Sequence, residues 1–193
     1  MNAFEHFFCS SSLWGFISRR QLLPWILSGA RLGDHVLEIG AGYGAATSYL
    51  GERVARITSL EYDRNMLLRM KSRNSSTAYA AVQGDGARLP FAGATFSSAV
   101  AILVLHHLKS VEQQDRLFAE VFYALRPGGV FIAFEIGDTW LNRALHFRST
   151  FTPLAPGSVF PRLTAAGFSR VSVDFRHGVF WVSAVRPNDD SGG

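Results

Sequence analysis

The chain has 193 residues, the usual size of one globular domain with a full hydrophobic core. Hydrophobic residues make up 48% and charged residues 18% of it, which is ordinary for a folded globular protein. The formal net charge of +4 comes from scattered basic residues rather than a long basic run, so we expect no nucleic-acid-binding surface.

Cysteine content and hydropathy narrow the class further. The single cysteine, Cys9, excludes a disulfide framework within the chain and any multi-cysteine metal cluster. Apolar runs such as residues 99–105 are too short to cross a bilayer. The N-terminus lacks the early basic region of a signal peptide, so we expect a cytoplasmic protein without a membrane span.

An aromatic-rich segment, residues 1–30, precedes the first predicted strand. Its bulky aromatic residues are Phe4, Phe7, Phe8, Trp14, Phe16 and Trp25. We expect a helical extension that either packs against the core or closes as a lid over a substrate pocket. Residues 31–186 would then form the main domain, and the polar, glycine-containing tail 187–193 is expected to be disordered.

The most informative stretch reads as a buried strand that runs into a glycine-rich turn. Residues 36–39 are mostly apolar, as a central parallel strand requires. Gly40, Gly42 and Gly44 allow a sharp turn and a close approach to a ligand. Residues 45–50 suit a helix, whose first N–H groups would face an anionic part of that ligand.

The spacing of these glycines leaves the cofactor open. Gly40-x-Gly42-x-x-Ala45 satisfies the dinucleotide fingerprint, and Glu61 follows at a suitable distance for a carboxylate that binds a ribose. The longer run Glu38-x-Gly40-x-Gly42-x-Gly44 equally resembles motif I of the class I S-adenosylmethionine-dependent methyltransferases.

Strand-like and helix-like segments alternate through the middle of the chain. Asp63 is expected to cap one helix, and Ser110-x-x-Gln113 is a capping box that opens another. The further predicted strands cover residues 54–60, 78–83, 98–105 and 130–135. This alternation predicts a parallel sheet with helices on both faces.

The last third of the chain departs from the regular alternation of strands and helices. Residues 158–166 are predicted as a helix that Gly167 terminates. Residues 168–175 and 179–185 are predicted strands joined by only three residues. Such a short connection joins antiparallel strands, so we expect a hairpin at one edge of the sheet.

Five parallel strands followed by an antiparallel pair is the arrangement of class I methyltransferases, and this chain resembles that family in five ordered segments. Besides motif I, they are residues 61–63, 84–91, 104–108 and 125–129. The resemblance implies an α/β, Rossmann-like, seven-stranded and mostly parallel sheet with a C-terminal antiparallel hairpin. One departure is Phe96-Ser97, where the family usually has Phe-Asp, at the end of a strand remote from the ligand-binding edge.

The resemblance also implies the cofactor, S-adenosyl-L-methionine. Glu61 would accept the ribose hydroxyls and Asp85 the adenine amino group, while Glu38 is expected mainly to hydrogen-bond the glycine turn. The full expected set of cofactor-binding residues is Glu38, Gly40, Ala41, Gly42, Gly44, Glu61, Tyr62, Asp85, Gly86 and Leu103.

His106 and His107 are the expected catalytic residues, because imidazole titrates near neutrality and can act as a general base. A role in shaping the pocket is equally open for both. Glu135, Asp138 and His146 could line the acceptor side. We expect no metal site, because the Asp-rich site of metal-dependent relatives is absent.

The absence of several family motifs narrows the possible classes of methyl acceptor. Residues 105–108 lack the Asn/Asp-Pro-Pro-aromatic segment of enzymes that methylate nucleic-acid amino groups, and Cys9 lies outside the region where a cytosine-attacking cysteine would stand. The paired glutamates of protein arginine methyltransferases are also absent. A small-molecule or lipid acceptor remains. The alternatives are a non-catalytic methyltransferase-like module and an NAD-binding oxidoreductase.

The acceptor pocket itself is predicted to be largely apolar. We expect the N-terminal segment to close over it with Trp14, beside His106 and near Tyr43 and Trp140.

Overall fold

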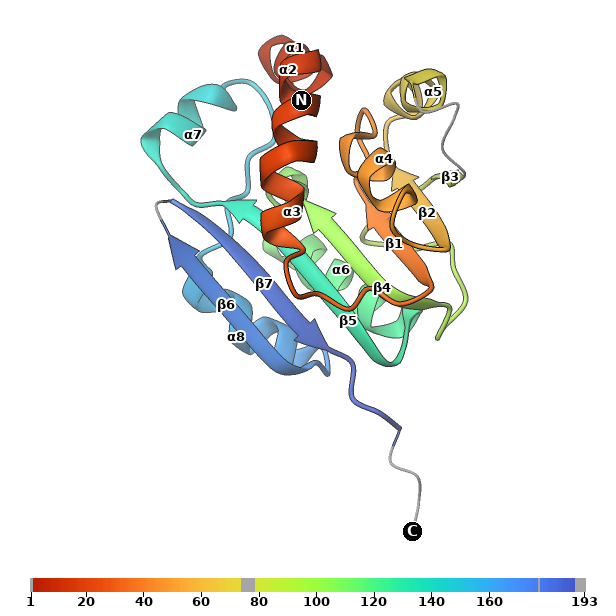
Figure 1. Ribbon diagram of the computed structural model, residues 1–193. Helices are drawn as coiled ribbons and strands as arrows, with labels where there is room; N and C mark the ends of the chain where they lie inside the picture. Colours follow the sequence, from red (N-terminus) through yellow and green to blue (C-terminus); the bar gives the residue numbers. More distant parts are fainter. Residues whose placement is uncertain (1, 74–78, 177, 190–193) are drawn as a thin grey trace.

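The computed structural model describes residues 2–73, 79–176 and 178–189 and contains one seven-stranded sheet (Figure 1). Its order is β3-β2-β1-β4-β5-β7-β6. Strands β1 to β5 are parallel, β7 is antiparallel to β5, and β6 is antiparallel to β7. The strands are β1 His35–Ile39, β2 Arg56–Glu61, β3 Ala80–Gln83, β4 Phe96–Ile102, β5 Leu125–Ile136, β6 Ser169–Arg176 and β7 Val179–Val185. The predicted fold class, including the terminal hairpin, is confirmed.

Helices cover both faces of the sheet (Figure 1), with α3 and α4 on one face and α6 and α8 on the other. The helices are α1 Ala3–Ser10, α2 Ser12–Ile17, α3 Leu23–Ile26, α4 Ala45–Gly51, α5 Arg64–Arg73, α6 Val111–Ala124, α7 Trp140–Leu145 and α8 Pro156–Ala165. A π-helical turn, Ser18–Leu22, joins α2 to α3, and a 3₁₀ turn, Leu105–His107, follows β4. Among the described residues, no helix combines the length and apolarity that a membrane crossing requires.

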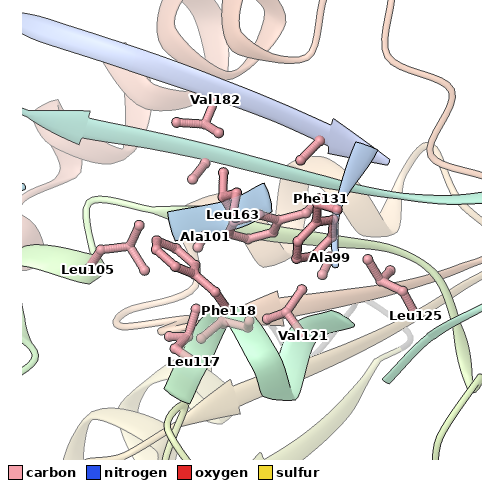
Figure 2. Close-up of a cluster of buried hydrophobic side chains, with 14 of the residues drawn as sticks. Ala99, Ala101, Leu105, Leu117, Phe118, Val121, Leu125, Phe131, Leu163 and Val182 are labelled. Atoms are coloured by element: carbon pink, nitrogen blue, oxygen red, sulfur yellow. The ribbon is translucent and has the colours of Figure 1, made fainter. Parts of the chain in front are cut away.

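The larger hydrophobic cluster lies between the sheet and helices α6 and α8 (Figure 2). Leu117 and Val121, which the sequence places on one face of α6, are both fully buried there. Phe118 of the same helix packs edge to face against Phe131 of β5, with 6.1 Å between ring centroids. This cluster fixes α6, and with it the loop between β4 and α6 that carries His106 and His107.

The N-terminal extension is helical and divides into two parts. Leu23 and Ile26 of α3 are buried in the cluster on the other face of the sheet. Trp25 makes edge-to-face contacts with Phe134 and Trp181. This part is therefore core, whereas α1 and α2 lie beyond the end of the sheet toward which β4 points (Figure 1).

Several predicted boundaries differ from the structure. The strand predicted at residues 98–105 is Phe96–Ile102, because Leu103 takes a positive φ of 57° and residues 105–107 turn into the 3₁₀ segment. The helix predicted from residue 158 begins at Pro156, which suits a first helical turn.

The predicted helix caps are formed, one of them with a change of partner. Asp63 Oδ1 accepts hydrogen bonds from the backbone N–H groups of Asn65 and Met66. Ser110 Oγ accepts from Gln113 N, but the Gln113 side chain accepts from Lys109 N rather than from Ser110. Of the predicted disordered tail, residues 187–189 have no regular secondary structure and residues 190–193 lie outside the described part.

Candidate functional site

A cavity of about 460 Å³ lies at the carboxyl ends of the central parallel strands. Open α/β sheets bind their ligands at this edge. One side is formed by the glycine turn and by the loops that follow β2, β3 and β4, and the other by the N-terminal helices. The N-terminal residues that line it are His6, Cys9, Trp14, Ser18, Leu22 and Leu23.

The glycine turn has the backbone conformation that its sequence predicts. Gly40, Gly42 and Gly44 have φ values of 69°, 56° and 83°, in the region that side chains with a Cβ disfavour. At Gly40 the lack of a side chain is also a spatial requirement, because a Cβ there would lie 2.0 Å from Cγ2 of Val104. The turn is therefore held close against the loop after β4.

Glu61, at the end of β2, ties the next loop to the glycine turn. Its Oε2 accepts a hydrogen bond from Gly42 N at 2.8 Å, and its Oε1 accepts one from Asp63 N at 2.9 Å. Burial raises the pKa of this carboxyl group, while the two backbone hydrogen bonds act in the opposite direction. The side chain is 7% exposed and lines the cavity.

Glu38 differs from the expectation that it hydrogen-bonds the glycine turn. Its Oε2 accepts hydrogen bonds from the hydroxyls of Thr47 on α4 and Ser59 on β2, at 2.5 Å and 2.6 Å. The turn is held by Glu61 instead. Burial raises the pKa of Glu38 to about 7, against the two hydroxyl hydrogen bonds, which lower it.

The structure brings nearly all the expected cofactor-binding residues to this cavity. Asp85 is exposed at its rim, where its Oδ1 accepts from Ala87 N. Gly44 is the exception, since it caps α4 and does not line the cavity. The expected residues that line it are Glu38, Gly40, Ala41, Gly42, Glu61, Tyr62, Asp85, Gly86 and Leu103.

The two expected catalytic histidines occupy different positions. His107 lines the cavity, whereas His106 is only 2% exposed and lies behind it. His106 Nδ1 donates to Oε2 of Glu135 at 2.5 Å. Glu135 is completely buried and also accepts from the backbone N–H groups of Val104 and Leu105. It therefore holds the backbone of the loop after β4 as well as the His106 ring.

His107 is a neutral imidazole at neutral pH. Burial lowers its pKa to about 4, and the neighbouring His106 acts in the same direction. Its Nδ1 lies 3.3 Å from the carbonyl oxygen of Thr150, to which it donates. Thr150 also lines the cavity.

Of the residues proposed for the acceptor side, His146 joins the histidine pair and Asp138 does not. One ligand atom of His146 lies within 4.8 Å of one from each of His106 and His107. Asp138 is exposed and forms an ion pair with Arg143, with 2.6 Å between Oδ2 and Nη2.

The predicted acceptor pocket needs two corrections. Trp14 and Tyr43 line the cavity as expected, but Trp140 is 80% exposed and does not. Of the two predicted catalytic histidines, His107 rather than His106 lies in the wall. The exposure of Trp140 follows from α7, which has no buried residue.

Two hydrogen bonds around the cavity were not predicted from the sequence. His6 Nδ1 and Tyr43 Oη are hydrogen-bonded at 2.9 Å, which joins α1 to the glycine turn. The bond between Glu135 and His106 was also missed, although one signal was available. A carboxylate directly after the apolar run 130–134 must find donors if it is buried.

Comparison with known proteins places these features in a family. A family model described as a methyltransferase domain matches residues 37–133, which is half of the chain. A solved structure of an S-adenosylmethionine-dependent methyltransferase from Mesorhizobium loti superposes with a TM-score of 0.72 at 20% identity. The superposition covers 92% of this chain and 99% of that one.

Two of the curated relatives that match in sequence illustrate the similarity. The chain is 32% identical over 132 residues to the demethylmenaquinone methyltransferase of Beutenbergia cavernae, covering 66% of this chain and 53% of the relative. It is 33% identical over 112 residues to sterol methyltransferase-like 2 of Botryococcus braunii, covering 55% and 28%. The chain spans about half the length of the first relative and less of the second. The fold, the ordered motifs and the domain match together show that this chain belongs to the methyltransferase domain family.

Proposed function

We propose that this chain transfers a methyl group from S-adenosyl-L-methionine to a small-molecule or lipid acceptor. The observation that carries the proposal is the hydrogen bond between Glu61 Oε2 and Gly42 N. It fixes a buried carboxylate and the glycine turn against the same cavity. Binding at this edge of a parallel sheet agrees with the general behaviour of open α/β folds.

The residues present suit this cofactor. A Cβ at Gly42, which lines the cavity, would meet no atom closer than Met66 Cε at 3.6 Å, so a ligand can approach the backbone there. Glu61 would accept the ribose hydroxyls, and Asp85 would accept from the adenine amino group. When bound, the cofactor supplies an electrophilic methyl group on a positively charged sulfur. The carboxylate of Glu61 in the wall favours such a positively charged ligand.

The acceptor would lie beside the loop after β4. His107 is neutral at neutral pH and lines the cavity from this loop, so it can orient an acceptor group or take its proton. His106, held from behind by Glu135, would act as a positioning residue. Helices α1 and α2 would form the lid and exclude water, which favours a poorly solvated nucleophile.

The lining of the cavity supports an apolar acceptor. Trp14, Leu22, Ile102 and Leu108 contribute apolar side chains to it. The names of the two sequence relatives mention a menaquinone precursor and sterols, which are lipids. We therefore propose a lipid or another largely apolar molecule with a nucleophilic oxygen, nitrogen or carbon.

Radiolabelled methyl transfer tests this proposal. The full chain is incubated with methyl-labelled S-adenosylmethionine and a panel of quinols, sterols and fatty acids. The expected result is label in the extracted lipid together with an equal amount of S-adenosylhomocysteine. Cofactor binding without release of S-adenosylhomocysteine for any acceptor would instead support the alternative of a non-catalytic methyltransferase-like module.

A further inference from the structure

Three histidines from distant parts of the chain meet at the wall of the cavity. His106 and His107 belong to the 3₁₀ turn after β4, and His146 follows α7. One ligand atom from each ring lies within 4.8 Å of the other two. The ring centroids are 4.1 Å apart for His106 and His107, 5.0 Å for His106 and His146, and 5.5 Å for His107 and His146.

All three rings are held in the same way, through Nδ1. His106 Nδ1 donates to the Glu135 carboxylate at 2.5 Å. His107 Nδ1 donates to the carbonyl oxygen of Thr150 at 3.3 Å, and His146 Nδ1 donates to that of Asn142 at 2.7 Å. A neutral imidazole that donates through Nδ1 carries its lone pair on Nε2. Metal-binding histidines show this arrangement, with the second nitrogen donating to a carboxylate or a carbonyl group.

The surroundings add negative charge and an apolar wall. Glu5 Oε1 lies 3.7 Å from His146 Nε2 and accepts a hydrogen bond from Ser149 Oγ. A cation bound at this nitrogen would be attracted by the carboxylate. Phe151 stacks on His146 with 4.5 Å between ring centroids and contacts His106 at 5.7 Å. An aromatic ring in this position limits access of water to one side of a metal site.

We propose that His106, His107 and His146 form a binding site for a divalent transition ion of the zinc class. Three neutral imidazoles suit Zn²⁺ and leave one coordination position open. Zn–N distances of about 2.0–2.1 Å place tetrahedral ligand nitrogens about 3.3 Å apart. The ligand atoms lie within 4.8 Å of one another, so the rings would have to move closer to bind the ion.

The ion would lie at the acceptor side of the cavity, because His107 belongs both to the cluster and to the cavity wall. With the ion bound, Nε2 of His107 would be a ligand and not a proton acceptor. This site goes beyond methyl transfer from a sulfonium, which needs no metal. It also differs from the sequence-based expectation of no metal site. The sequence concealed the cluster, because α6, β5 and α7 separate His146 from the other two histidines.

Zinc titration of the full chain tests the proposal. The protein is prepared without a histidine tag, treated with EDTA, dialysed, and titrated with Zn²⁺ by calorimetry. Co²⁺ is then added in its place, and the visible absorption reports the coordination number. We expect one ion per chain and the absorption of four- or five-coordinate Co²⁺. His107→Gln and His146→Gln should each weaken binding at least 10-fold, because each removes one ligand.

A control variant and the affinity for S-adenosylhomocysteine distinguish loss of the metal site from loss of the proposed function. His35→Gln removes a histidine at the opposite end of β1, where it contacts Thr58, and should leave zinc affinity unchanged. Affinity for S-adenosylhomocysteine should be retained in His146→Gln, so that failure of the metal site is distinct from failure of the proposed function. Absence of Zn²⁺ and Co²⁺ binding in the wild-type chain, or equal zinc affinity in His146→Gln, would overturn the proposal.

Discussion

Glu135 and His106 form a buried hydrogen bond, with 2.5 Å between the carboxylate Oε2 and the ring Nδ1. The same carboxylate accepts from the backbone N–H groups of Val104 and Leu105. One side chain therefore holds both the loop after β4 and the ring behind the cavity wall. Glu135 therefore contributes both to the stability of the loop and to the orientation of His106.

Glu135→Ala should destabilise the fold strongly, because it leaves three donors, two buried and one partly buried, without an acceptor. A loss of about 1–3 kcal/mol per unsatisfied group predicts at least about 3 kcal/mol in the free energy of unfolding. Urea denaturation measures it. Glu120→Ala is the matched control, since Glu120 accepts one backbone hydrogen bond, from Leu89 N, and should cost about 1 kcal/mol. Equal losses in the two variants would contradict this account of Glu135.

Glu38 makes stability depend on pH. Its pKa is raised by burial from 4.5 to about 7, so the folded state holds a proton that the unfolded state releases. The stabilisation of the folded state by protonated Glu38 is therefore fully present below pH 4.5 and is lost as the pH rises to about 7. The shift corresponds to about 3 kcal/mol. Glu61, whose pKa burial also raises, acts in the same direction.

The test is the difference between the wild-type chain and Glu38→Gln, because His107 gives an opposite slope. Its pKa is lowered from 6.5 to about 4, so its contribution increases stability as the pH rises across that range. Glutamine copies the neutral form of Glu38 and can still accept from Thr47 and Ser59. Urea denaturation between pH 4.5 and 7.5 should show the wild type losing stability relative to Glu38→Gln. A constant difference would exclude the raised pKa.

Gly40 and Gly42 should differ in their tolerance of alanine. Both have positive φ, but a Cβ at Gly40 would lie 2.0 Å from Val104 Cγ2, whereas the nearest atom to one at Gly42 is 3.6 Å away. Gly42→Ala should cost about 1–2 kcal/mol, from backbone strain alone. Gly40→Ala should cost clearly more and should weaken cofactor binding. Val104→Ala should partly rescue it, and no rescue in that double variant would contradict the proposed clash.

Truncation separates the lid from the core within the N-terminal extension. Deletion of residues 1–17 removes His6, Cys9 and Trp14 from the cavity wall but leaves Leu23 and Ile26 in the core. We expect this variant to fold, to bind the cofactor and to lose methyl transfer. Deletion of residues 1–25 also removes the buried Leu23 and should unfold the chain, as circular dichroism can show. Full transfer activity after the shorter deletion would rule out a lid.

The sequence predicts the sheet well, because alternating strands and helices and a three-residue connection leave little freedom of topology. It also predicts the edge of the sheet where Gly40, Glu61 and Asp85 gather, since the carboxyl ends of parallel strands meet there. It does not predict how the loop after β4 is held. The positive φ of Leu103 accompanies a hydrogen bond from its N–H to Phe134, a contact between segments far apart in the chain.

The position of His146 could likewise not be predicted from the local sequence. It depends on how the segment after α7 packs against the 3₁₀ turn, where Thr152 N donates to the carbonyl oxygen of His106. No periodicity or motif encodes that contact. Patterns along the chain locate elements and their ends, whereas the partners of buried polar side chains depend on tertiary packing.

Calorimetric titration with S-adenosylmethionine and S-adenosylhomocysteine tests the central claim most directly. The comparison uses the wild-type chain, Glu61→Ala, Asp85→Ala and the control Asp34→Ala. Asp34 pairs with Arg56 and Arg126 and directly precedes β1, at the end away from the cavity. Loss of charged hydrogen bonds worth about 1.5–3 kcal/mol predicts roughly 10- to 100-fold weaker binding in Glu61→Ala and Asp85→Ala. Asp34→Ala should bind like the wild type. Unchanged affinity in both cavity variants, or binding of NAD with no binding of either methionine cofactor, would contradict the account.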